Sequence, residues 1–205
     1  MQQTEETTAS APEHDSAGLP PVDVYVDMTP NPNALKFIVN IPVKNSGNST
    51  YRSPTECGEN KLAREIFTVR GVDQLHIFEN IITVSKFSYQ DWSEIEDQIV
   101  AIITKMMPEH DADYFDPDPE EERRRNLPQD LKDIEAVLDK TIRPGLQGDG
   151  GDIQTVKYEN NVLLVKYQGA CGTCPSSSTG TLEAIRAILR DEYNPDIEVY
   201  IAPEF

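Results

Sequence analysis

A stretch of the sequence, QGACGTCPSSSTGTL at 168–182, decides the fold of the second half of the chain. Its cysteines, Cys171 and Cys174, are separated by two residues, and no Asp, Glu, Lys or Arg occurs in it. An alternating apolar run precedes it at 162–167, and apolar residues at helical spacing begin at Leu182. The sequence therefore predicts a strand, a cysteine loop and a helix, in that order.

The elements on both sides of this loop predict a small α+β domain at 126–205. Its apolar patterns favour helices and strands at the following places: a helix at 130–142, strands at 153–158 and 162–167, a helix from 182, and a strand at 197–201. We expect Pro144-Gly145 to end the first helix. The predicted order is α-β-β-(CxxC)-α-β.

A second small α+β domain is expected at 21–107, before the cysteine domain. Its patterns predict these elements: a strand at 35–39, a short helix around 62–66, a hairpin of 74–79 and 81–87, and an amphipathic helix from Asp91. Asp91 and Glu94 are spaced as a capping box, and Pro108 is expected to end this long helix. Both domains are long enough to bury a core.

Two acidic segments flank the first domain. Residues 1–20 contain four acids and no Lys or Arg, which predicts a disordered tail. Residues 108–125 contain eight acids, three arginines and three prolines, which is typical of an interdomain linker. The tail has neither the basic start of a secretory signal nor the arginines of a transit peptide, so the expected location is the cytoplasm.

The charge of the chain limits its partners. With 36 acidic and 18 basic residues the net charge is −18, which opposes binding to nucleic acid. No apolar run is long enough to span a bilayer, so a membrane role is not expected either. The cysteine domain has 7 basic and 13 acidic residues, a net charge of −6, so two copies should associate less tightly at low salt.

Three chemistries suit the spacing of Cys171 and Cys174: a thiol-disulfide oxidoreductase, a structural zinc site and an iron-sulfur cluster. Zinc and iron-sulfur sites normally take four ligands, and this domain supplies two cysteines. Two copies of the domain would supply four thiolates. The third cysteine, Cys57, lies outside any such spacing and is expected to be a bystander. Spacing leaves the three chemistries open.

Two motifs add a family resemblance. The runs IRPGLQGDGGD at 142–152 and GACGTCPSS at 169–177 resemble the Nfu domain, which is the C-terminal domain of NifU-type iron-sulfur proteins. The runs TPNPNALKF at 29–37 and FENIITV at 78–84 resemble the Nfu N-terminal domain. Within the first motif, we interpret the glycines as a tight turn and Asp149 or Asp152 as turn formers or caps.

The resemblance implies a cluster carrier rather than an enzyme. It implies a 4Fe-4S cluster, with 2Fe-2S as the alternative, held by Cys171 and Cys174 of two subunits in a cluster-bridged homodimer. The implied partners are upstream cluster-assembly proteins and apo iron-sulfur clients. Because a small cluster loop offers little specificity, we expect the first domain to recruit those partners.

Overall fold

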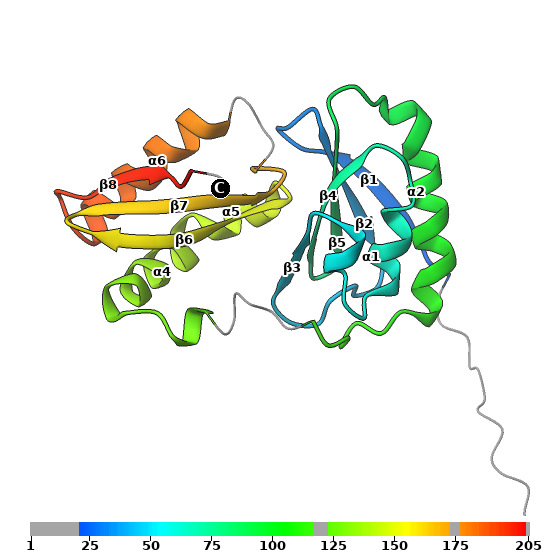
Figure 1. The fold of residues 1–205 in the computed structure, drawn as a ribbon, viewed down its shortest axis with the longest axis horizontal. Coiled ribbons are helices and arrows are strands. Elements are labelled where there is room, and N and C mark those ends of the chain that lie inside the picture. Colours follow the sequence, from blue (N-terminus) through cyan, green and yellow to red (C-terminus); the bar gives the residue numbers. More distant parts are fainter. Residues whose placement is uncertain (1–20, 117–122, 173–176, 204–205) are drawn as a thin grey trace, which may run out of the picture.

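A computed structural model describes residues 21–116, 123–172 and 177–203, the side chains of 177–179 excepted. The sequence-predicted α+β class is confirmed: two domains, each a sheet with helices, lie beside one another (Figure 1). The expected tail at 1–20, part of the expected linker at 117–122, and Cys174 lie outside the described residues.

The first domain is built on an antiparallel five-stranded sheet in the order β1-β2-β5-β4-β3. Its strands are β1 (Val24–Met28), β2 (Ala34–Val39), β3 (Asn48–Tyr51), β4 (Val72–Phe78) and β5 (Ile81–Lys86). Its helices are η1 (Pro54–Glu56), α1 (Lys61–Ile66), α2 (Trp92–Met106) and η2 (Met107–Glu109). In Figure 1, α1 and α2 lie together on one side of this sheet, so the other face is turned to the second domain.

The long helix α2 forms where its apolar stripe predicts it. Ile95, Ile99 and Ile103 are buried in the core beneath the sheet. Asp91 caps the helix by accepting a hydrogen bond from the Ser93 N–H at 2.9 Å. The capping box is only half formed, because Glu94 accepts from Gln90. Helix α2 ends at Met106, just before Pro108 as predicted, and the chain then continues as the short 3-10 helix η2.

Residues 110–116, which the composition assigns to a linker, pack against the first domain. Tyr114 is buried, and its hydroxyl donates to Ser49 Oγ at 3.2 Å. The Tyr51 hydroxyl donates to Asp116 Oδ2 at 2.6 Å, and burial raises the pKa of Tyr51. Burial of the Tyr114 ring, with its hydroxyl still hydrogen-bonded, stabilises the packing of this segment despite the repulsion among the neighbouring acids.

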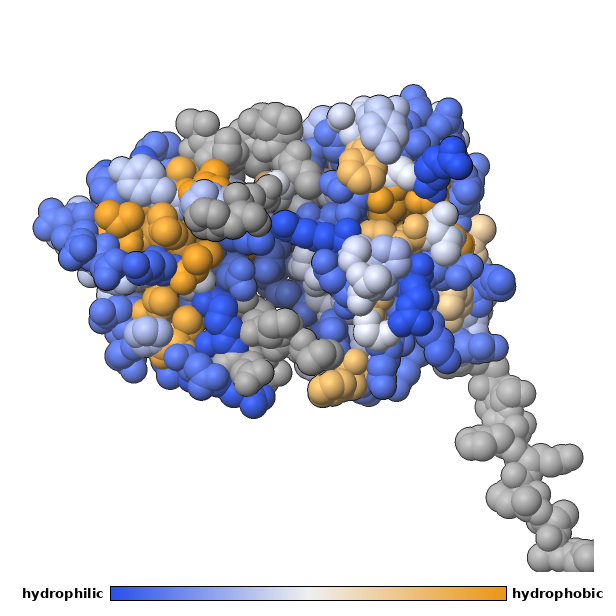
Figure 2. All heavy atoms as spheres, in the orientation of Figure 1, coloured by the Kyte–Doolittle hydropathy of each residue, from blue (hydrophilic) through white to orange (hydrophobic). Residues whose placement is uncertain are grey.

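The second domain is a three-stranded sheet with helices on one face. Its elements are α4 (Gln129–Thr141), α5 (Arg143–Gly148), β6 (Gly151–Glu159), β7 (Val162–Gly169), α6 (Ser177–Glu192) and β8 (Glu198–Ile201). The antiparallel hairpin β6-β7 is extended by β8, which pairs parallel to β7 after the helical crossover. Buried residues such as Ile134, Leu163 and Ile185 join the helices to the sheet. Figure 2 shows apolar side chains on the face of this domain opposite its helices.

The first helix of this domain ends just before Pro144-Gly145, as predicted, but a second short helix that the sequence analysis did not predict follows it. Helix α4 ends at Thr141, and α5 begins at Arg143 with Pro144 in its first turn. Proline fits there because the first N–H groups of a helix have no intrahelical acceptor. Within the described ranges, no helix combines the length and the apolar character that crossing a membrane requires.

Candidate functional site

Cys171 lies two residues after β7, at the end of the hairpin that meets the first domain (Figure 1). Its side chain is partly exposed. Helix α6 begins at Ser177, so the predicted order of strand, cysteine loop and helix is present. The second predicted ligand, Cys174, falls outside the described residues, as do the hydroxyl side chains that follow it up to residue 179.

Glycines of the GDGGD run form the surface against which the Cys171 sulfur packs. A Cβ added at Gly151 would stand 2.5 Å from Cys171 Sγ, and one at Gly169 would stand 2.5 Å from the Gly150 carbonyl oxygen. Gly150 and Gly169 also have φ of 79° and 60°, which favours glycine. The Ala170 N–H donates to the Gly150 carbonyl at 3.0 Å. The two sequence motifs therefore form one structural unit.

Tyr167 places a buried hydroxyl near the same sulfur. Its side chain is 6% exposed, and its hydroxyl has no hydrogen-bond partner among the described residues. Burial raises the pKa of Tyr167, and the proximity of Cys171 raises it further. The hydroxyl therefore keeps its proton and remains a potential donor beside the cysteine loop.

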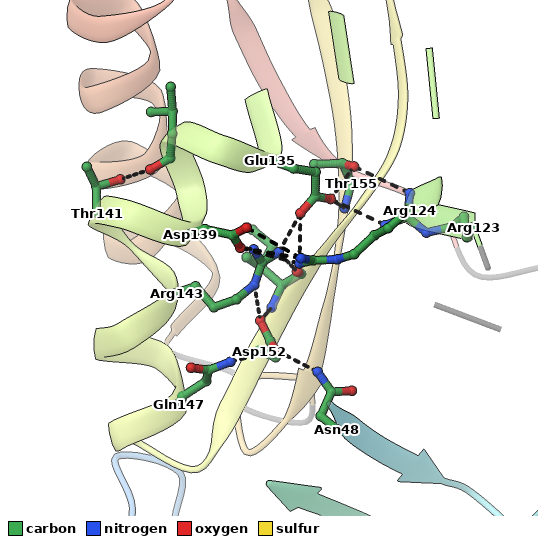
Figure 3. Close-up of polar contacts among 12 residues, drawn as sticks. Asn48, Arg123, Arg124, Glu135, Asp139, Thr141, Arg143, Gln147, Asp152 and Thr155 are labelled. Atoms are coloured by element: carbon green, nitrogen blue, oxygen red, sulfur yellow. Dashed lines mark hydrogen bonds and ion pairs between the residues drawn. The ribbon is translucent and has the colours of Figure 1, made fainter. Parts of the chain in front are cut away.

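A buried charge network anchors Asp152, the last residue of the GDGGD run (Figure 3). Arg143, at the start of α5, donates from Nε to Asp152 Oδ1 and from Nη2 to Glu135 Oε2, both at 2.8 Å. Its Nη2 also donates to the Ile153 carbonyl at 2.8 Å. Asp152, expected from sequence to be a turn former or cap, is instead the buried carboxylate that ties β6 to α5. Strand β6 also contains Lys157 and Glu159, so the charge of Asp152 alone did not mark it as a buried residue.

Glu135 joins the network from α4. Its carboxylate accepts from Thr155 Oγ1 at 2.6 Å and pairs with Arg124 at 2.9 Å, while Arg123 lies at 3.3 Å. Burial acts to raise the pKa of Glu135, but the positive charge of Arg143, the Thr155 hydrogen bond and Arg124 outweigh it, so the pKa is lowered. The arginines at the end of the acidic 108–125 segment are therefore part of the second domain.

Side chains of the first domain donate hydrogen bonds to the cysteine loop and to the GDGGD run. Asn31 Nδ2 donates to the Ala170 carbonyl at 2.9 Å, and Lys36 Nζ donates to the Gly148 carbonyl at 2.8 Å. Asn48 Nδ2 donates to Asp152 Oδ2 at 3.0 Å. The partners are separated by 139, 112 and 104 residues, so no local pattern could have revealed them.

Cys57 has a different environment. It is 1% exposed in the core of the first domain, and its Sγ donates to the Ser53 carbonyl at 3.5 Å. Burial raises the pKa of the Cys57 thiol to about 11, so it is not a thiolate at neutral pH. Across the described residues, no group of three or more His, Cys, Asp and Glu side chains is arranged to hold a metal ion.

Comparison with known proteins assigns both halves of the chain. Residues 24–110 match the family model described as scaffold protein Nfu/NifU N terminal, and residues 134–200 match that of the NifU-like domain. The chain is 33% identical over 182 residues to the "NFU1 iron-sulfur cluster scaffold homolog, mitochondrial" of Drosophila persimilis, covering 83% of this chain and 61% of the relative.

The protein of the same name in Drosophila erecta is 33% identical over 189 residues, covering 89% of this chain and 65% of the relative. The chain thus spans less than two thirds of the length of these relatives. A solution structure of a NifU-like protein from Saccharomyces cerevisiae is 23% identical, with a TM-score of 0.43, covering 54% of this chain and all of that one.

These relatives correct one prediction. The cytoplasmic location expected from the sequence is contradicted, because the matched relatives are named as mitochondrial proteins. The expectation rested on a signal that the first 20 residues lack, and composition alone is a poor guide to location. The two domain matches occur in the order that the sequence motifs predict, and the chain belongs to the Nfu family of NifU-like proteins.

Proposed function

We propose that this chain is an iron-sulfur cluster scaffold and carrier, not an enzyme. In this proposal Cys171 and Cys174 of two copies hold one 4Fe-4S cluster, which is handed to apo-proteins. The observation that carries it is the partly exposed Cys171 on a loop packed by glycines. The relatives' printed names, as cluster scaffold homologues, agree with it.

The number of ligands is the reason for two copies. An iron-sulfur cluster takes four thiolates, and Cys57, the remaining cysteine, is buried in the other domain. The uncharged stretch at 168–182 keeps carboxylates away from an anionic cluster, and helix α6 begins directly after the loop with the end that favours negative charge. A cluster held between two loops can be released when the copies separate, which suits transfer.

Anaerobic reconstitution with iron and sulfide tests the assignment. We expect about four irons per dimer, as the assumed cluster requires. Cys171→Ser and Cys174→Ser should each abolish stable loading, because each change removes two of the four thiolates that the dimer supplies. Cys57→Ser is the matched control and should load normally. A Cys171→Ser protein that retained a normal cluster would overturn the proposal.

The same experiment separates the other two chemistries left open by the CxxC spacing. Stoichiometric zinc in protein purified without oxygen, with no iron uptake, would favour a zinc-bridged interaction module. A reversible Cys171–Cys174 disulfide together with turnover of a disulfide substrate would favour a thiol-disulfide oxidoreductase. Among the described residues, neither the zinc module nor the oxidoreductase has an additional structural feature in its favour.

We further propose that the first domain recruits upstream assembly proteins and apo iron-sulfur clients. Removing residues 1–116 tests this while leaving Arg123 and Arg124 in place to pair with Glu135. Cluster binding should persist, and transfer to some clients should slow. Equal transfer rates to every client would contradict a recruiting role.

A further inference from the structure

One face of the first domain's sheet is polar yet buried. Lys36 on β2, Gln74 and His76 on β4 and Thr83 on β5 share this face, because Lys36 and His76 are both register partners of Thr83. An antiparallel sheet usually leaves such a face to solvent while its other face covers the core. Here Gln74, His76 and Thr83 are 3%, 1% and 1% exposed, so another part of the chain covers them.

The covering part is the unit formed by the GDGGD run and residues 169–172. A Cβ added at Gly150 would stand 2.6 Å from Thr83 Oγ1 and 2.9 Å from Lys36 Cγ. One at Gly169 would stand 3.1 Å from His76 Cγ. Only residues without side chains allow the sheet to approach this closely, and the Asn31 and Lys36 hydrogen bonds then reach the Ala170 and Gly148 carbonyls.

This contact is specific, but some of the polar groups on the sheet face are buried without hydrogen-bond partners. Among the described residues, Gln74 Nε2, His76 Nε2 and Thr83 Oγ1 are buried without hydrogen-bond partners. His76 and Thr83, which lie against the glycines of the second domain, would regain water partners if the two domains separated, so their burial opposes docking. The shape and the three hydrogen bonds favour docking. Because these effects oppose one another, we expect the contact to be able to open.

We propose that the polar face of the first domain's sheet is a reversible cap on the Cys171 loop, and that capping competes with pairing of two copies through a cluster. The cluster part of this inference rests on the proposed function. The sheet contacts Gly150 and binds Ala170, which are the neighbours of Gly151 and Cys171. A second copy whose cysteines share a cluster with Cys171 must bring its own loop into this space.

The effect of capping on the dimerisation constant can be calculated. The apparent affinity of each copy is reduced by the fraction of molecules that is uncapped. Two copies must both be uncapped, so the dimerisation constant varies with the square of that fraction. Where the capped form predominates, a tenfold weakening of docking therefore strengthens cluster-dependent dimerisation by up to about a hundredfold.

Asn31→Asp is the sharpest test. The variant keeps Oδ1 as acceptor for the Asn33 N–H at 2.9 Å, which preserves the local turn. It replaces the Nδ2 donor with an oxygen facing the Ala170 carbonyl. The matched control is Asn45→Asp, the same change at an exposed position of the first domain. Lys36→Met, with exposed Lys61→Met as its control, provides a second variant pair.

The first measurement uses the chain without cluster, under reducing conditions. Alkylation of each cysteine by iodoacetamide is followed by mass spectrometry. We expect Asn31→Asp and Lys36→Met to speed Cys171 alkylation several-fold and the controls to leave it unchanged. Cys57 is the internal reference for folding, because its buried thiol reacts only if the first domain opens. Unchanged Cys171 rates in both variants would overturn the cap.

The second measurement is the dimerisation constant of the reconstituted protein by analytical ultracentrifugation. We expect dimerisation to be tighter in both variants than in their controls. Weaker dimerisation would mean that the sheet helps to build the cluster site. Unchanged dimerisation would mean that docking and pairing are independent, and either result overturns the competition. If the parent chain takes up no iron, the proposed function fails, while the alkylation result still decides whether the loop is capped.

Discussion

At the scale of single residues, Arg143 neutralises two carboxylates that the second domain buries. Glu135 and Asp152 are 5% and 2% exposed, and Arg143 bonds to both. A buried charge whose partner is removed is left without solvent or counter-charge. The network therefore secures the strand that carries Gly151, against which the Cys171 sulfur packs.

Arg143→Ala should destabilise the second domain by about 3–5 kcal/mol, since it leaves two buried carboxylates poorly compensated. Urea unfolding followed by circular dichroism measures this loss. Trp92, the only tryptophan, lies in the first domain, so its fluorescence reports the other domain separately. Arg190→Ala is the control: it removes a half-exposed ion pair with Glu198 and should cost about 1 kcal/mol or less.

The lowered pKa of Glu135 predicts how stability depends on pH. Its folded-state pKa lies below the ordinary value of 4.5, so the unfolded chain binds the proton more readily. The stabilisation is thus fully present above about pH 4.5 and is lost as the pH falls through the folded-state pKa. Unfolding measured between about pH 6 and pH 3 should show this loss for the second domain. A Glu135→Gln variant with an unchanged pH slope would contradict it.

At the scale of elements, the long periodic segments were predictable and the short polar ones were not. The α2 stripe, the β4-β5 hairpin and the β6-β7 hairpin follow from apolar spacing. The edge strands β1 and β3 were missed. Strand β3 (NSTY) is short and mostly polar, whereas β1 (VYVDM) has alternating apolar residues that the sequence analysis overlooked. The place of Cys171, in the loop between a strand and a helix, was predicted from the CxxC motif.

Gly169 and Gly145 make a matched pair of predictions at this scale. Gly169→Ala places a Cβ at a φ of 60° and 2.5 Å from the Gly150 carbonyl, which should cost of order 1–3 kcal/mol. Gly145→Ala, in α5 with nothing within 4 Å, should stabilise by about 0.5–1 kcal/mol. Thermal unfolding of the two variants decides between them. If the two variants changed the stability equally, a side chain at position 169 would not strain the backbone at the end of β7.

At the scale of the whole molecule, the sequence gives the two domains and their order but not how they dock. The docking contacts join residues more than 100 positions apart. Those of Asn31 and Lys36 end on backbone carbonyls, which every residue type possesses. A polar sheet face also reads as an ordinary solvated face in a sequence. The capping surface could therefore be found only in three dimensions.

Net charge yields a prediction at this scale. Each cysteine domain carries a net charge of −6, from 7 basic and 13 acidic residues, and a shared cluster adds negative charge between two copies. The range of this repulsion falls from about 30 Å at 0.01 M salt to about 3 Å at 1 M. Cluster-dependent dimerisation, measured by ultracentrifugation across that range, should strengthen several-fold with salt. Insensitivity to salt would show that the charges lie too far from the junction to matter.

The parallel pairing of β8 with β7 has a consequence for synthesis of the chain. The cysteine loop is anchored on one side by β7 and on the other by α6, and the core contacts of α6 include Ile197 and Val199, in and beside the final strand. On a ribosome, Ile197 and Val199 emerge after both cysteines have done so. The part of the core that packs α6 against β8 therefore cannot form until well after Cys171 has been synthesised.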